Sequence, residues 1–71
     1  MIWVEIDGEQ IEVIDMAEAK RIIMDRFPNV KFMKPHKLDG QRITHARRVS
    51  PVPSDLDLIP VAVIVEDELA L

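Results

Sequence analysis

The sequence contains no cysteine, which excludes disulfide bonds and metal sites built on thiolates. Its 71 residues make one domain and leave no room for a second hydrophobic core. A domain of this size buries a modest share of its surface, and without disulfides the remaining means of support is association with another chain. The absence of cysteine also fits a reducing compartment, so we expect a cytoplasmic protein.

Long apolar runs are absent too. The longest, residues 58–65, contains Pro60 and falls far short of the roughly 20 apolar residues of a membrane-spanning helix. The acids Glu5 and Asp7 come early and no basic stretch precedes them, unlike a secretory signal. We therefore expect a soluble protein with no membrane partner.

Positive charge is scarce outside one segment. Residues 31–48, called here the basic segment, hold six of the nine Lys and Arg residues and carry a balance of +5. Residues 1–30 carry -4 and residues 49–71 carry -5, with no base in the latter. The net charge of -4 therefore conceals the basic segment, which also holds both histidines. This segment is the best indication of a functional surface.

Residues 2–14 predict a β-hairpin. Apolar residues alternate with polar ones, as in a half-buried strand. Asp7-Gly8 is a dipeptide favoured in two-residue type I′ turns, and such a turn fixes the register. The predicted register pairs Ile2 with Val13, Trp3 with Glu12, Val4 with Ile11, Glu5 with Gln10 and Ile6 with Glu9.

Residues 15–27 predict an amphipathic helix. Asp15 is a favoured N-cap, and Glu18 follows it at the spacing of a capping box. Apolar residues recur at helical spacing and would cover the apolar face of the hairpin. Pro28 disfavours helical geometry at the preceding residue and ends the helix.

The middle of the chain has weaker signals. Residues 30–34 fit a short strand that Pro35 closes, and we expect an irregular basic loop over residues 34–57. Residues 41–49 offer a strand as the alternative, but their alternation is poor. A long irregular loop in so small a domain is often functional.

Residues 58–65 predict a final strand that is apolar on both faces, with Val61, Val63 and Val65 on one of them. Such a strand belongs at the centre of a sheet, with Pro60 near its start. The expected fold is therefore α+β, a small single-domain ββαββ sheet spanning residues 1–71 with one helix on one face. The element order resembles that of a β-grasp sheet, in which the final strand runs parallel to the first. A different strand order is the alternative.

These features favour a small non-catalytic interaction or regulatory module. It would present the basic loop and an open apolar sheet face to an acidic protein partner, and the open face also suggests a homodimer formed through the sheet. The alternative without a binding function is a solvated loop whose positive charges balance the acidic strands of the same molecule. The candidate partner-binding residues are Trp3, Lys34, His36, Lys37, Arg42, His45, Arg47 and Arg48.

Two other classes of function remain open. The basic loop is able to bind the phosphates of a nucleic acid, although it lacks the aromatic residues that stack on bases. An enzyme with His36 or His45 as general base needs an orienting partner that the sequence does not reveal. The histidine spacing matches no metal motif, and we expect no metal and no cofactor.

Overall fold

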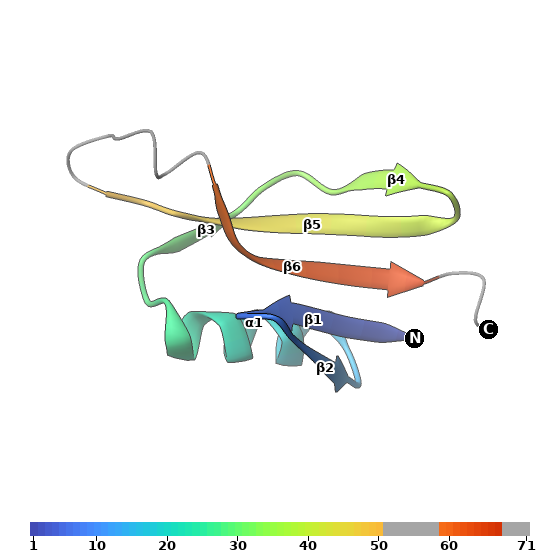
Figure 1. Ribbon diagram of the computed structural model, residues 1–71, viewed down its shortest axis with the longest axis horizontal. Coiled ribbons are helices and arrows are strands. Elements are labelled where there is room, and N and C mark those ends of the chain that lie inside the picture. The colour runs from blue at the N-terminus through green and yellow to red at the C-terminus, as the bar shows by residue number, and fades with distance from the viewer. Residues whose placement is uncertain (51–58, 68–71) are drawn as a thin grey trace.

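One helix packs on a six-stranded antiparallel sheet in the computed structural model, which describes residues 1–50 and 59–67 (Figure 1). This arrangement confirms the α+β class with a helix on one face. The elements in chain order are β1 (Ile2–Ile6), β2 (Glu9–Val13), α1 (Met16–Arg26), β3 (Val30–Phe32), β4 (His36–Leu38), β5 (Gln41–Arg48) and β6 (Pro60–Asp67).

The β1–β2 hairpin has the predicted register at all five positions, from Ile2 opposite Val13 to Ile6 opposite Glu9. Asp7 and Gly8 have φ angles of 49° and 78°. Positive φ at both central residues is what a type I′ turn requires, and the twist of this turn matches that of the flanking strands. The turn therefore directs the apolar side of the hairpin towards the helix.

Helix α1 begins where the sequence predicts. The Asp15 side chain accepts a hydrogen bond of 2.8 Å from the backbone N–H of Glu18, which satisfies one of the free donors at the helix N-terminus. The helix buries Ala19 and Ile23 against the sheet. At its other end, the Phe27 N–H donates to the Ile23 carbonyl at 2.8 Å, and Pro28 follows.

Strand β6 lies at the centre of the sheet, between β1 and β5, as its two-sided apolar pattern predicts. It begins at Pro60, while residue 58 lies outside the described residues. Val4 pairs with Ile64 in an antiparallel ladder. The β-grasp arrangement is therefore wrong, because it requires β1 and the final strand to be parallel.

The irregular loop predicted over residues 34–57 is also wrong for the part that the structure describes. Residues 36–48 form the β4–β5 hairpin, whose turn at Asp39 and Gly40 has φ angles of 50° and 79°. Strand β5 pairs on one side with β6 and on the other with β3 and then β4. A central strand thus replaces the loop, and residues 51–57 lie outside the described residues.

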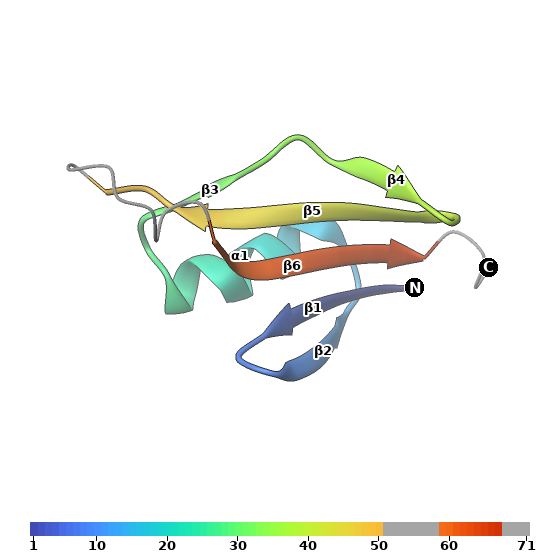
Figure 2. The same ribbon diagram turned by 45° about the horizontal axis from the view of Figure 1, so that its top comes forward.

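The hydrophobic core lies between α1 and one face of the sheet. In Figure 2 the strands lie side by side from β4 to β2, with α1 behind them. Val4, Ile23 and Ile64 are fully buried in this core, which also takes in Ala46 and Ala62. The helix therefore covers one face of the sheet, and the other face is the candidate surface for binding.

Candidate partner-binding surface

The face of the sheet opposite α1 is called here the open face. Successive strand residues point to opposite faces, so the row next to the buried Val4, Ile64 and Thr44 faces the other way. That row consists of Trp3, Val65 and Ile43, with Glu12 and His36 at its ends. Every described helix and strand either belongs to the sheet or, like α1, packs on the opposite face.

An apolar strip crosses the middle of the open face. Trp3 and Ile43 are half-buried and flank Val65 in register. Val65 is only 5% exposed, although it does not belong to the core cluster under the helix. Trp3 also donates from Nε1 to Glu5 Oε1 at 3.4 Å, which holds both side chains on this face. The strip is thus a second, shallow apolar layer whose larger side chains shelter Val65.

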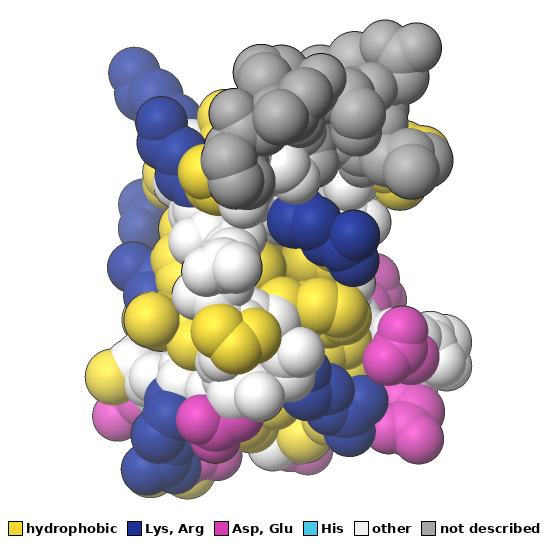
Figure 3. Space-filling view, turned by 90° about the vertical axis from the view of Figure 1, so that its left-hand side faces the viewer, with side chains coloured by type: hydrophobic (Ala, Val, Ile, Leu, Met, Phe, Trp, Pro, Cys, Tyr) yellow, Lys and Arg dark blue, Asp and Glu magenta, His cyan; other side chains and the backbone are white. Residues whose placement is uncertain are grey.

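Opposite charges flank the apolar strip. Glu5 and Glu12 lie on β1 and β2, while Arg47 and its register partner Lys31 lie on β5 and β3. The end-on view of Figure 3 shows several Lys and Arg side chains along the upper left of the molecule and several acidic side chains at the lower right, with further charges of both signs near its lower edge. The open face is therefore acidic on the β1–β2 side and basic on the β3–β5 side, with the apolar strip between them and Asp67 beyond the strip at the end of β6.

The two histidines come together at the basic end. His36 is exposed on β4 and His45 is half-buried on β5. Their rings stack, with the centroids 5.2 Å apart and the planes at 22°. Each imidazole ring thus packs on the other. This contact packs β4 against β5 and does not pair a base with an orienting carboxylate.

The basic segment does not form one surface. Strand alternation places Lys37, Arg42 and Arg48 on the helix side of the sheet. Arg48 pairs with Val30 of the core rim. Arg42 pairs with Lys37 and lies two residues from Thr44, whose register partner Ile64 belongs to the core. Lys34 lies between β3 and β4 and belongs to neither strand. Of the eight candidate residues, the structure gathers four on the open face: Trp3, His36, His45 and Arg47.

The prediction for Val61 is also wrong. Its spacing predicts that it shares a face with Val63 and Val65, but it packs against the core. The β5–β6 register shifts here, with Ala46 opposite Ala62 and Arg47 opposite Pro60. An extra residue of this kind changes which face the neighbouring side chain reaches.

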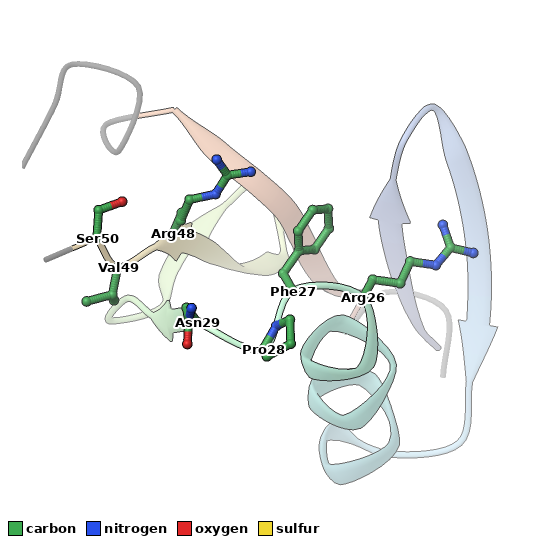
Figure 4. Close-up of a pocket in the computed structure, with 7 residues that line it drawn as sticks. All are labelled: Arg26, Phe27, Pro28, Asn29, Arg48, Val49 and Ser50. Atoms are coloured by element: carbon green, nitrogen blue, oxygen red, sulfur yellow. The ribbon is translucent and has the colours of Figure 1, made fainter. Parts of the chain in front are cut away.

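A groove of about 300 Å³ opens on the helix side, where α1 ends near the end of β5. Its lining includes Arg26, Phe27 and Arg48 (Figure 4). Arg26 points away from Arg48 towards the hairpin, where its guanidinium lies 3.5 Å from Asp7 Oδ2 and 3.7 Å from Glu9 Oε2. The groove therefore does not bring two guanidinium groups onto one ligand.

Sequence reasoning did not include Glu5, Glu12, Lys31 and Ile43 among the site residues. The register that places Glu5 and Glu12 beside Trp3 was already predicted from the hairpin. The positions of Lys31 and Ile43 needed the pairing of β5, which its irregular pattern conceals.

Residues 1–50 and 59–67 contain no cluster of three or more His, Asp or Glu side chains placed to hold a metal ion. In the same residues, no helix is both long and apolar enough to cross a membrane. Comparisons of the chain with protein-family models, with curated proteins and with solved structures found no match.

Proposed function

We propose that this protein is a small non-catalytic interaction module that binds an acidic protein partner through the open face, in a regulatory or accessory role. The observation that carries the proposal is the apolar strip of Trp3, Val65 and Ile43 with Lys31 and Arg47 beside it. The lack of cysteine supports a site of action in the cytoplasm.

The chemistry of the strip suits a protein surface. Tryptophan and arginine are enriched among the residues that dominate binding energy, and they act best at the centre of a desolvated patch. Flanking cations attract an acidic partner and orient it before contact. Covering a sheet face that has half-buried apolar side chains at its centre removes apolar surface from water and is therefore favourable.

The nucleic-acid alternative has weaker support. Phosphate binding along a strand of nucleic acid needs a continuous row of cations. Here Lys37, Arg42 and Arg48 lie on one face of the sheet, and Lys31 and Arg47 lie on the other. Glu5 and Glu12 also share the open face and would repel phosphates.

The enzymatic alternative is weaker still. The ring contact of His36 and His45 is with each other, whereas a general base works with a positioned substrate and an orienting group. We therefore place both histidines in the binding surface.

The proposal is tested by placing a photo-crosslinking residue at position 43, and at position 14 as control, in the native host. Ile14 is 83% exposed, whereas Ile43 is half-buried, so exposure alone would favour reaction at position 14. We expect a discrete adduct from position 43 and none from position 14. Equal labelling, or none from position 43, contradicts binding through the open face.

Charge dependence is tested by Lys31→Glu with Arg48→Glu as matched control. Both side chains are exposed and lie near each other on β3 and β5, but on opposite faces. We expect Lys31→Glu to reduce the adduct severalfold and Arg48→Glu to leave it unchanged. An equal loss with both variants contradicts the assignment to one face. An adduct with a nucleic acid supports the alternative.

A further inference from the structure

We propose that the open face binds a second copy of this chain, with the two open faces packed around a two-fold axis parallel to β6. The inference rests on the proposed function of the open face and names its acidic partner as the acidic end of the same face. The complementarity of charge across the face carries the argument.

The sheet has the symmetry that such packing needs. Strand β6 is central, with β1 and β2 on one side and β5, followed by β3 and β4, on the other. A two-fold axis along β6 therefore places β1 over β5 of the second copy, and β2 over β3 and β4. Interfaces of this kind use the same patch on both chains, which must then be complementary to itself.

The apolar strip is complementary to itself under this rotation. In the row that contains Trp3, Val65 meets the same residue of the second copy, and Trp3 meets Ile43. In the next row Val63 lies on the axis and meets its own counterpart. The half-buried apolar side chains thus cover one another at the centre of the interface.

The charged ends are complementary too. Glu12 meets His36 of the second copy, and Glu5 meets His45, with Arg47 two residues further along the strand. An imidazole N–H is able to donate a hydrogen bond to a carboxylate. An axis perpendicular to the strands would place Glu5 and Glu12 over the same acidic end, and like charges in contact are costly.

Arg47 supplies a second observation. Its Nε atom is buried and has no hydrogen-bond partner within residues 1–50 and 59–67. A buried N–H donor without an acceptor costs free energy in the single chain. The proposed packing brings the carboxylate of Glu5 of the second copy to this end of the face, close to the positive charge of Arg47.

The size of the face sets the expected affinity. Neighbouring strands lie about 4.8 Å apart, so the sheet is about 20 Å wide between its outer strand axes. Such a face buries less than the roughly 800 Å² per partner of a standard interface, which indicates a weak dimer. Sedimentation equilibrium at several hundred micromolar is the suitable measurement.

The decisive experiment uses two variants with opposite charge changes. Glu5→Arg/Glu12→Arg makes both ends of the face basic, and Lys31→Glu/His36→Glu makes both ends acidic; all four positions are exposed. We expect the unchanged protein to dimerise and each variant alone to dimerise at least about tenfold more weakly. We expect an equimolar mixture to regain the dimer, because each acidic end then meets a basic end.

Controls and contrary outcomes follow from the same design. Arg21→Glu and Asp25→Arg on the exposed side of α1 should leave the dimer unchanged, and circular dichroism verifies that each variant folds. A monomer at all concentrations, or a mixture no stronger than either variant, overturns the inference. If the unchanged protein is monomeric while position 43 still crosslinks to a different protein, the proposed function holds and only this inference fails.

Discussion

His36 and His45 stack with their ring centroids 5.2 Å apart. His36 pairs with Ile43 in register, so the stack is a diagonal contact across the β4–β5 ladder. Strand β4 has only three residues, all exposed, and β5 is its pairing partner. The stack therefore adds a side-chain contact to the backbone pairing of this edge strand.

Removing one ring should loosen the edge. We expect His36→Ala to lower the free energy of unfolding by roughly 0.5–1 kcal/mol, the usual range for an aromatic cross-strand pair. Lys37→Ala on the same strand, whose side chain faces the helix side, is the control. Urea denaturation of both variants measures the difference. Equal losses would show that the ring contact contributes nothing beyond strand propensity.

The β1–β2 turn depends on backbone conformation at Gly8. Its φ angle is 78°, and a Cβ atom added there would meet no atom within 4 Å. Gly8→Ala should therefore cost about 1–2 kcal/mol through the backbone alone. Gly8→Asn should cost less, because asparagine adopts positive φ more readily. If thermal unfolding gave the two variants equal stability, the explanation from φ would fail.

The N-cap of α1 gives a local test. Asp15→Ala removes the 2.8 Å hydrogen bond to the Glu18 N–H and should destabilise the protein by about 1 kcal/mol. Asp25→Ala, near the other end of the same helix, is the matched control. Its carboxylate lies at the end where the helix dipole is unfavourable to it, so we expect no loss there. Chemical denaturation with detection by circular dichroism is the measurement.

Burial on β6 should determine the cost of truncation. Ile64 is fully buried, whereas Ile59, just before the strand, is 60% exposed. We expect Ile64→Ala to cost about 2–5 kcal/mol, by loss of apolar burial and by formation of a cavity. Such a loss is a large part of the stability of a small domain. Ile59→Ala should stay within about 0.5 kcal/mol. Comparable losses in equilibrium unfolding would contradict the position of the core.

The parts of the fold that the sequence predicts are those where local signals agree. In the β1–β2 hairpin, the Asp7-Gly8 turn and the apolar alternation specify the same register. In α1, the Asp15 cap and the apolar stripe specify the same start. Each of these signals acts over a few residues, so it does not depend on how distant parts of the chain pair.

Strand β5 was not predicted because the residues at its buried positions are not large and apolar. The residues that it turns to the core are Thr44 and Ala46, at 4% and 0% exposure. Phe32, the register partner of Ala46, supplies apolar bulk from β3. The Asp39-Gly40 turn has the same φ pattern as the first hairpin, but a three-residue β4 gives no alternation to support it.

The sequence indicated which parts of the chain contribute to the candidate surface, but not which of their side chains lie on the same face. The charge pattern located the basic segment, and the hairpin register placed Trp3 opposite the helix. Which cations share the face with Trp3 depends on pairing between β3, β5 and β6, which are distant in sequence. A shift of one residue in that pairing would exchange Arg47 for Arg48.

The position of β6 also constrains the order of assembly during synthesis. Within the described residues, the β1–β2 hairpin and the strands β3, β4 and β5 share no backbone ladder, and strand pairing connects them only through β6. A ribosome that has released no more than residues 1–50 therefore exposes two unpaired strand edges, one on β1 and one on β5. Unpaired strand edges are able to pair with other chains until residues 60–67 emerge and insert between β1 and β5.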